Sequence, residues 1–279
     1  MGLTKIPPDW RKYIGNRVVE YNKERFPDLK LTGLLALLEK ETWGDWTSII
    51  PVVNRYYAKI ESKKRWGDKT PGYVMHLPLI KELFPEAKVI HMVRDGRDVI
   101  PSILKYWSVG PQTTSLMETA FYWKRHVSRG VELGPKLFGE NYMELKYEDL
   151  VSNPEMQIRK VCDFIGEVYE ASMMDRSMDR PDVLPDREWH KETQKQINDK
   201  NVGKWKVSLS TYEVMVIQNY ARGLLRKFEY DLEKGFSMRA LRDVSGYRIK
   251  KWYKNKYLSF KVGIYSFLAS NGFKKKARL

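Results

Sequence analysis

Apolar residues recur at intervals of three and four along much of this chain, which is the spacing of one face of an α-helix. The pattern predicts helices over residues 10–25, 29–40, 49–60 and 116–138. Another helix is predicted to start at Asn153-Pro154 and to end at Gly166. Thr70-Pro71 also has the form of a helix start, with Thr70 as the capping residue.

Two shorter segments have the pattern of β-strands. Ala87–Val93 is a continuous apolar run rich in β-branched residues, which is typical of a buried strand, and Tyr142–Tyr147 alternates between apolar and polar residues. Strands that are separated by long helical segments are typical of an α/β fold. We therefore predict an α/β domain.

The strand at Ala87–Val93 runs directly into R-D-G-R-D, and helical spacing resumes at Val99–Trp107. Cations at the carboxyl end of a strand, beside the start of a helix, form an anion site at the mouth of an α/β sheet. Arg94 and Ser102 are eight residues apart, a spacing that can close both donors on one phosphate. We expect Arg97 and Asp98 to pair with each other or with the sheet edge.

Four segments, in order, resemble the sulfotransferases that use 3'-phosphoadenosine 5'-phosphosulfate (PAPS). They read G-D-K-T-P at 67–71, R-D-G-R-D-V-I-P-S at 94–102, Y-M-E-L-K-Y-E-D-L at 142–150 and N-V-G-K-W-K at 201–206. The motif style is closest to the tyrosylprotein and bacterial carbohydrate sulfotransferases. The resemblance covers roughly residues 65–232 and implies a fold like that of the P-loop NTPases, with a parallel sheet flanked by helices.

The resemblance also implies roles for particular residues. It assigns catalysis to Lys69, which would stabilise the oxygens of the transferred group, and it implies no metal. It assigns donor binding to five residues: Arg94 and Ser102 at the 3'-phosphate, Tyr147 near the adenine, and Lys200 and Lys204 as further contacts. In these enzymes lysines stand where phosphoryl transfer uses metal ions.

One family element has no counterpart here. The first strand and the glycine-rich loop for the 5'-phosphosulfate, of the form G-x-x-R-S-G-T-T, are not found in the sequence. Either the sequence begins downstream of the true start, or the protein has lost that half of the donor site. The general base is not assigned, because Glu39, Glu41 and His190 are candidates by residue type only.

Composition limits the classes of protein to which this chain can belong. A chain of 279 residues with 42% hydrophobic residues is long enough to bury a core and is not disordered. The single cysteine, Cys162, lies in an apolar run, so we expect a buried thiol and no disulfide, and we expect Trp123 in the core. No apolar run approaches about 18 residues. We expect a cytoplasmic protein, unless an upstream anchor precedes the sequence.

The net charge of +15 is concentrated at one end. Residues 236–279 hold twelve Lys and Arg and one acid, a net of +11, interleaved with aromatic residues. We therefore predict two regions, an α/β domain at 1–235 and a helical C-terminal extension at 236–279. The extension either contacts anionic membrane or packs its aromatic residues on the domain. No recognition motif supports nucleic acid as a partner.

Three functions remain open at this point. The first is transfer of a sulfuryl group from PAPS to a hydroxyl of a carbohydrate, lipid-linked or tyrosine acceptor. The second is a non-catalytic protein that binds 3'-phosphoadenosine nucleotides or acts as a scaffold. The third is a nucleotide kinase-like protein, against which the absent G-x-x-x-x-G-K-[ST] loop counts.

Overall fold

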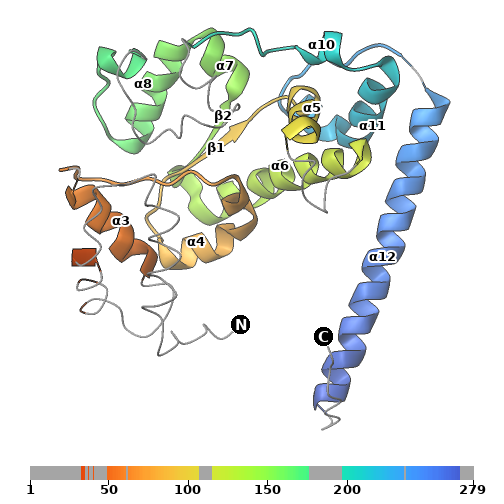
Figure 1. Cartoon of the computed structure of the whole chain (residues 1–279), viewed down its shortest axis with the longest axis horizontal. Coiled ribbons are helices and arrows are strands. Elements are labelled where there is room, and N and C mark those ends of the chain that lie inside the picture. Colours follow the sequence, from red (N-terminus) through yellow and green to blue (C-terminus); the bar gives the residue numbers. More distant parts are fainter. Residues whose placement is uncertain are drawn as a thin grey trace. The chain divides into compact units, whose positions relative to one another are not determined.

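The computed structural model describes residues 33, 34, 37, 40, 49–60, 62–106, 115–175, 197–235 and 237–270 (Figure 1). Most of the two N-terminal helices predicted from the sequence lie outside these residues, as do the candidate bases Glu39, Glu41 and His190. The region that bears on the 5'-phosphosulfate loop lies outside them too, so that expectation stays a prediction.

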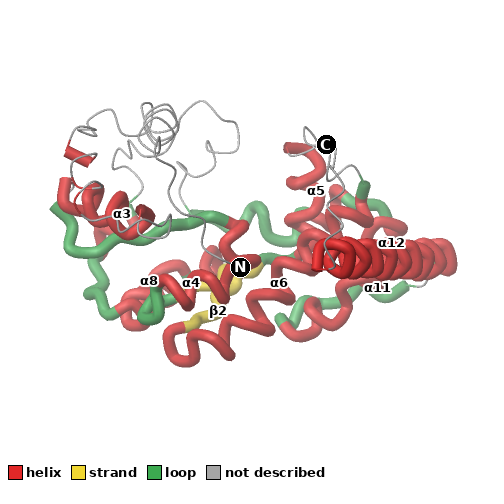
Figure 2. The backbone as a smooth tube through the Cα atoms, turned by 90° about the horizontal axis from the view of Figure 1, so that it is seen from below, coloured by secondary structure: helices red, strands yellow, loops and turns green. Residues whose placement is uncertain are grey.

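The two predicted strands are present and lie next to each other. Strand β1 (Val89–Val93) and strand β2 (Tyr142–Lys146) form a two-stranded sheet (Figure 2). Between them run α5 (Gly96–Tyr106), α6 (Leu116–Phe138) and the 3-10 turn η3 (Gly139–Asn141), a crossover of the kind that joins parallel strands. The predicted α/β class is confirmed.

The prediction that β1 is a buried strand is wrong for one of its faces. Ile90 is 37% and Met92 50% exposed, whereas Val93 is buried. β-branched residues form a strand whether or not both faces are covered, and in the described chain this sheet has two strands only. The apolar run at residues 87–93 therefore predicted more burial of β1 than the structure shows.

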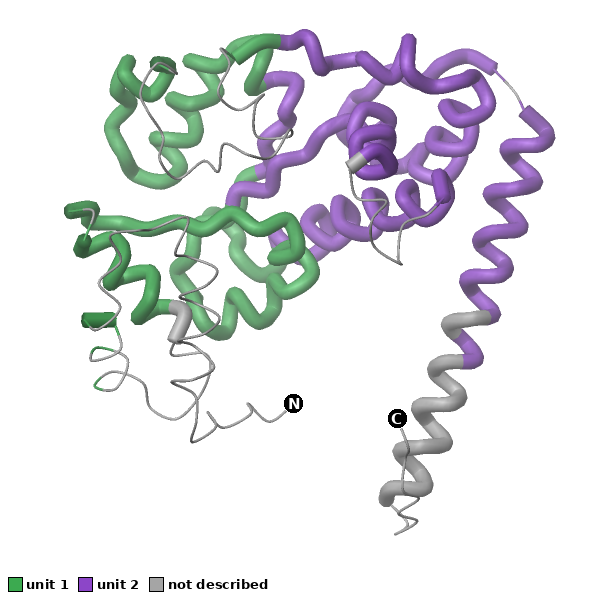
Figure 3. Tube along the Cα trace, viewed as in Figure 1, with its two compact units in different colours: residues 1–89, 136–143, 150–198 green, residues 90–135, 144–149, 199–279 purple. Residues whose placement is uncertain are grey.

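The chain divides into two compact units, each described here by itself (Figure 3). The first comprises residues 1–89, 136–143 and 150–198, and the second residues 90–135, 144–149 and 199–279. The predicted boundary between 1–235 and 236–279 is a different division, and it stays a prediction.

The first unit contains helices whose ends follow the sequence signals. Its elements are α3 (Ile49–Ile60), η2 (Pro71–His76), α4 (Leu77–Leu83), α8 (Pro154–Ile165), η4 (Ala171–Met174) and the end of α7 (Tyr147–Ser152). Helix α8 follows Asn153, and Gly166 ends it in the left-handed region at φ 78°, where glycine has no Cβ to clash. Cys162 is buried as predicted.

Thr70 precedes η2 as predicted, but its side chain makes no capping hydrogen bond. The turn that follows is a 3-10 helix, in which the Tyr73 N–H donates to the Thr70 carbonyl at 3.0 Å. The Thr70 carbonyl therefore satisfies the Tyr73 N–H, and the expected hydroxyl cap is wrong.

The second unit is built around α11 (Thr211–Lys227). Five consecutive residues, Val214–Gln218, are buried, so this helix is covered on several sides instead of along one stripe. Its core neighbours come from α5, α6 and α12 (Met238–Ser270) and include Ile100, Trp123 and Val244. Trp123 is a core residue, as predicted. Within the described chain, none of the helices combines the length and the apolar character needed to span a membrane.

Helix α11 begins with a reciprocal cap. The Ser210 hydroxyl accepts from the Glu213 N–H, and the Glu213 carboxylate accepts from the Ser210 N–H at 2.8 Å. We expect Ser210→Ala to lower the free energy of unfolding by about 1 kcal/mol, measured by urea denaturation. Ser208→Ala, an exposed serine in the short helix α10 (Trp205–Ser208), is the control. Equal effects of the two changes would contradict the role of the cap.

Candidate functional site

Arg94, the first residue after β1, is held from three directions. Its Nη2 donates to the Asn201 carbonyl at 2.5 Å, its guanidinium lies 4.6 Å from the centre of the Tyr147 ring, and its own carbonyl accepts from Trp123 Nε1 at 3.2 Å. Its Nε is buried and finds no acceptor among the described residues. Buried donors are nearly always paired in native proteins, so this oriented N–H is suited to an anionic ligand.

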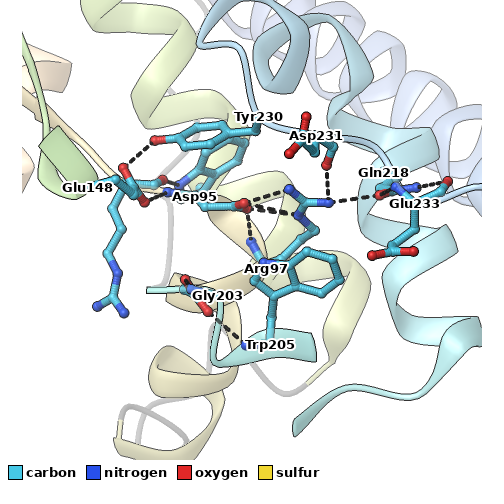
Figure 4. A network of polar contacts seen from close by, with 12 residues as sticks. Asp95, Arg97, Glu148, Gly203, Trp205, Gln218, Tyr230, Asp231 and Glu233 are labelled. Carbon is cyan, nitrogen blue, oxygen red and sulfur yellow. Dashed lines mark hydrogen bonds and ion pairs between the residues drawn. The ribbon is translucent and has the colours of Figure 1, made fainter. Parts of the chain in front are cut away.

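Tyr147 opens α7 directly after β2, and a hydrogen-bond chain fixes that start. The neighbouring Glu148 accepts from the Asp95 N–H at 2.9 Å and from the Tyr230 hydroxyl at 2.8 Å (Figure 4). Burial, and then the nearby Glu148 carboxylate, raises the pKa of Tyr230, which keeps this hydroxyl a donor. The structure thus brings together two residues predicted from separate segments, Arg94 and Tyr147.

Next to Arg94 lies a buried ion pair that the sequence did not predict. Arg97 binds the Asp95 carboxylate through two nitrogens, with Nη2 to Oδ2 at 2.7 Å and Nε to Oδ1 at 3.0 Å (Figure 4). Its Nη1 donates to Gln218 Oε1 at 2.9 Å and to the Asp231 carbonyl at 2.6 Å. Every side of this guanidinium is engaged, as a buried cation requires.

The predicted pairing of Arg97 with Asp98 is therefore wrong. Asp95 occupies the capping position of α5, where its carboxylate also accepts from the Arg97 N–H at 2.8 Å. That bond places the carboxylate beside the Arg97 side chain. Asp98 instead accepts from the backbone N–H groups of Gly203 and Trp205, both at 2.8 Å. Burial raises the pKa of Asp98, and these two hydrogen bonds and the Arg94 charge oppose the rise.

Ser102 lies farther along α5 and is exposed. Its hydroxyl reaches back to the Asp98 carbonyl at 3.4 Å, a weak bond within the helix. Within the described residues no hydrogen bond joins Ser102 to Arg94, so the predicted closure of both on one phosphate stays a prediction.

Comparison with known proteins decides the family. A family model described as "Sulfotransferase family" matches residues 21–171, more than half of the chain. The chain belongs to the sulfotransferase family.

Similar curated proteins include three sulfotransferases of different kinds. The protein-tyrosine sulfotransferase A of Caenorhabditis elegans is 28% identical over 112 residues, 39% of this chain and 30% of that protein. The omega-hydroxy-beta-dihydromenaquinone-9 sulfotransferase of Mycobacterium tuberculosis is 32% identical over 107 residues, 35% and 28%. Sulfotransferase 2A6 of Mus musculus is 29% identical over 156 residues, 49% and 54%. The matches thus span between 28% and 54% of the length of these relatives.

Two solved sulfotransferase domains share the fold. The domain from the curacin biosynthetic pathway has a TM-score of 0.58 at 17% identity and covers 84% of this chain and 82% of its own. The domain from the Synechococcus PCC 7002 olefin synthase has a TM-score of 0.54 at 22% identity and covers 75% and 80%. These similarities support the α/β, P-loop-like fold predicted for this sulfotransferase chain.

The other site residues predicted for this chain are exposed. Lys200 and Lys204 belong to the same compact unit as Arg94, and Lys204 directly precedes α10. Lys69 belongs to the first unit, in the segment before η2. The neighbouring Asp68 accepts from the Tyr73 hydroxyl at 2.5 Å, and burial followed by this bond raises the pKa of Tyr73. The catalytic assignment of Lys69 stays a prediction.

Sequence reasoning overlooked Asp95, and it expected Asp98 to pair with Arg97 or with the sheet edge instead of with the backbone of Gly203 and Trp205. One signal was available: an aspartate directly before a helix start is a common capping residue, so Asp95 was recognisable as a cap. Nothing local indicated that Asp98 would bind the backbone more than a hundred residues away.

The contribution of the buried Asp95–Arg97 pair to stability can be tested by substitution. Asp95→Ala leaves the Arg97 guanidinium buried without its carboxylate, and we expect the free energy of unfolding to fall by about 3–5 kcal/mol. The double change Asp95→Ala with Arg97→Met removes the stranded charge and is expected to cost less than Asp95→Ala alone. Glu155→Ala, which breaks an exposed pair with Arg159 at 2.7 Å, is the control and should have little effect. Urea denaturation measures all three, and a double variant less stable than Asp95→Ala would contradict this account.

Proposed function

We propose that the chain binds PAPS and transfers its sulfuryl group to an acceptor hydroxyl. The observation that supports this proposal is Arg94. In a member of the sulfotransferase family, a guanidinium held at the end of β1 keeps a buried Nε–H without an acceptor among the described residues. A phosphate supplies the acceptor that this donor lacks, and a planar guanidinium suits it. The Tyr147 ring beside it offers an apolar face to a nucleotide base.

Under this proposal each predicted site residue has its own role. Arg94 and Ser102 hold the 3'-phosphate, Tyr147 lies near the adenine, and Lys200 and Lys204 add charge along the donor. Lys69 offsets the negative charge that develops on the oxygen between phosphate and sulfuryl group, where a fixed cation lowers the barrier. Transfer in line with that bond then depends mainly on positioning, because the protein has little covalent chemistry to perform.

Family membership favours transfer over the non-catalytic alternative. The acceptor is an alcohol or phenol of a class that the names of similar proteins suggest. These classes are a tyrosine side chain, a hydroxylated menaquinone and, from the 3-beta-hydroxysteroid sulfotransferase of Cavia porcellus, a steroid. A carbohydrate hydroxyl is a fourth class, suggested by the motif style. Residues that contact the acceptor are not assigned.

Arg94 provides the binding test. Arg94→Ala should weaken binding of 3'-phosphoadenosine 5'-phosphate by about 2–5 kcal/mol, because a charged partner of the phosphate is lost. Isothermal titration calorimetry measures the effect, and Arg222→Ala, an exposed arginine on α11, is the control. Wild-type affinity in Arg94→Ala would overturn the 3'-phosphate assignment.

Lys69 provides the catalytic test. Radiolabelled sulfate transfer from PAPS is measured against tyrosine peptide, hydroxymenaquinone, steroid and sugar acceptors. Lys69→Met should lower the rate by at least about 100-fold and leave nucleotide affinity within a few-fold of wild type. Lys63→Met, an exposed lysine in the same segment, is the control. Nucleotide binding without transfer to any acceptor would favour the non-catalytic alternative.

We further propose that α12 contacts anionic membrane. Ala240 and Val244 are buried in the core, whereas Ile249, Trp252, Tyr253 and Tyr257 are each more than half exposed. Lys256 lies 4.9 Å from the centre of the Trp252 ring, and the helix around it is rich in lysine. Exposed aromatic residues beside cations are suited to the interface of an anionic bilayer. Tyr247, by contrast, packs against Phe121 and Tyr220, so part of the extension follows the packing alternative.

Vesicle cosedimentation tests this proposal. The full chain should bind phosphatidylserine-containing vesicles, less so at high salt, and bind phosphatidylcholine vesicles weakly. Replacing Trp252, Tyr253 and Tyr257 together by serine should reduce binding and leave nucleotide affinity unchanged. Binding that is equal for the two vesicle compositions, or unaffected by the triple change, would exclude this role.

A further inference from the structure

The segment 199–205 is attached to the start of α5 through the buried carboxylate of Asp98. Both oxygens of Asp98 are used: Oδ2 accepts from the Gly203 N–H and Oδ1 from the Trp205 N–H, each at 2.8 Å. Asp98 is 6% exposed, so water competes little for these bonds. Two bonds to alternate residues of one segment fix its direction as well as its position.

The same segment also binds Arg94, through a backbone carbonyl. The carbonyl of Asn201, two residues before Gly203, accepts from Arg94 Nη2 at 2.5 Å. The segment makes another contact at its C-terminal end, where the Trp205 ring stacks on the Arg97 guanidinium, 4.0 Å from the ring centre. Asp98, the 199–205 segment and Arg94 therefore form one continuous set of contacts within the second unit.

The segment also carries the two exposed lysines expected to contact the donor, Lys200 and Lys204. Their placement depends on the backbone between them. Gly203 in that backbone adopts φ 70°, a left-handed conformation that glycine reaches without strain. Anything that releases Gly203 from Asp98 therefore affects both lysines and the carbonyl that holds Arg94.

We propose that Asp98 is a positioning residue for the nucleotide donor: by binding the Gly203 and Trp205 N–H groups, it holds the 199–205 segment so that Asn201 orients Arg94 toward the 3'-phosphate. This rests on the proposed function, because it concerns the same site. Asp98 touches no donor atom itself and acts through the segment.

The chemistry requires a carboxylate and not only a polar side chain of that size. An asparagine at this position would offer one oxygen and one NH2 group. The NH2 group would face a backbone N–H, so one donor would stay unpaired and the two N–H groups would repel. Asp98→Asn therefore removes one of the two attachments with almost no change of volume.

The first measurement is on the free protein. In Asp98→Asn, the amide protons of Gly203 and Trp205 should exchange with solvent at least about tenfold faster than in wild type, as followed by NMR. Val202→Ala, an exposed residue of the same segment, is the matched control and should leave both exchange rates unchanged. Unchanged exchange in Asp98→Asn would overturn the proposal.

The second measurement separates positioning from general destabilisation. Asp98→Asn should raise the Kd for 3'-phosphoadenosine 5'-phosphate and the KM for PAPS about tenfold or more, with a much smaller change in kcat. If Asp98 acts through Arg94, the losses in Asp98→Asn and Arg94→Ala should not add in the double variant, whereas independent sites add. Additive losses, or equal falls in kcat and rises in KM, would mean that Asp98 is merely structural.

A third variant covers the case in which Asp98→Asn folds poorly. Gly203→Ala strains the backbone of the segment and leaves β1 and α5 untouched; space is not the obstacle, since a Cβ there would meet nothing within 4 Å. It should raise the Kd like Asp98→Asn, and wild-type affinity would overturn the proposal. Wild-type protein that binds no 3'-phosphoadenosine nucleotide would instead refute the proposed function, and this inference with it.

Discussion

The second compact unit depends on the buried bond between Arg97 and Asp95. The two side chains are 2% and 6% exposed, so both charges have left water, which alone would cost several kcal/mol per ion. The cost is offset because the guanidinium also binds Gln218 and the Asp231 carbonyl and stacks on Trp205. One cation thus joins the end of β1 to α11, to α10 and to the segment that follows α11. Its removal would strand an anion in the core.

This arrangement places the structural and the ligand-facing groups on neighbouring residues. Arg97 and Asp95 are buried and satisfy each other, whereas Arg94 contacts Asn201 and Tyr147 and keeps one buried donor without an acceptor among the described residues. Gln218 extends the network by accepting from the Glu233 N–H and donating to the Glu233 carbonyl. The network around Arg97 fixes the turn that carries Arg94, so under the proposed function this side chain would lose little freedom on binding a phosphate.

The local elements were predictable because their signals are local. Asn153-Pro154 and Gly166 delimit α8, and the apolar spacing of residues 116–138 gave α6 with its bounds. Arg94 and Tyr147 were assigned to one site through motifs, and they lie together. Asp95 could have been recognised as a helix cap, but its burial with Arg97 was not predictable, because that burial also involves Gln218, 121 residues away. The placement of Lys69 relative to Arg94 depends on how two units meet, which no spacing along the chain encodes.

The charges around the start of α5 alternate in sign. Arg94, Asp95, Arg97 and Asp98 sum to zero within five positions, so this turn exerts little field beyond a Debye length, about 8 Å at physiological salt. Under the proposed function, selectivity for the 3'-phosphate at Arg94 would therefore depend on direct contact. Long-range attraction of an anionic ligand has to come from exposed cations such as Lys200 and Lys204. Under that function, the residues that attract the ligand and the residue that binds its phosphate are different groups. Ionic strength should then change the association rate more than the dissociation rate.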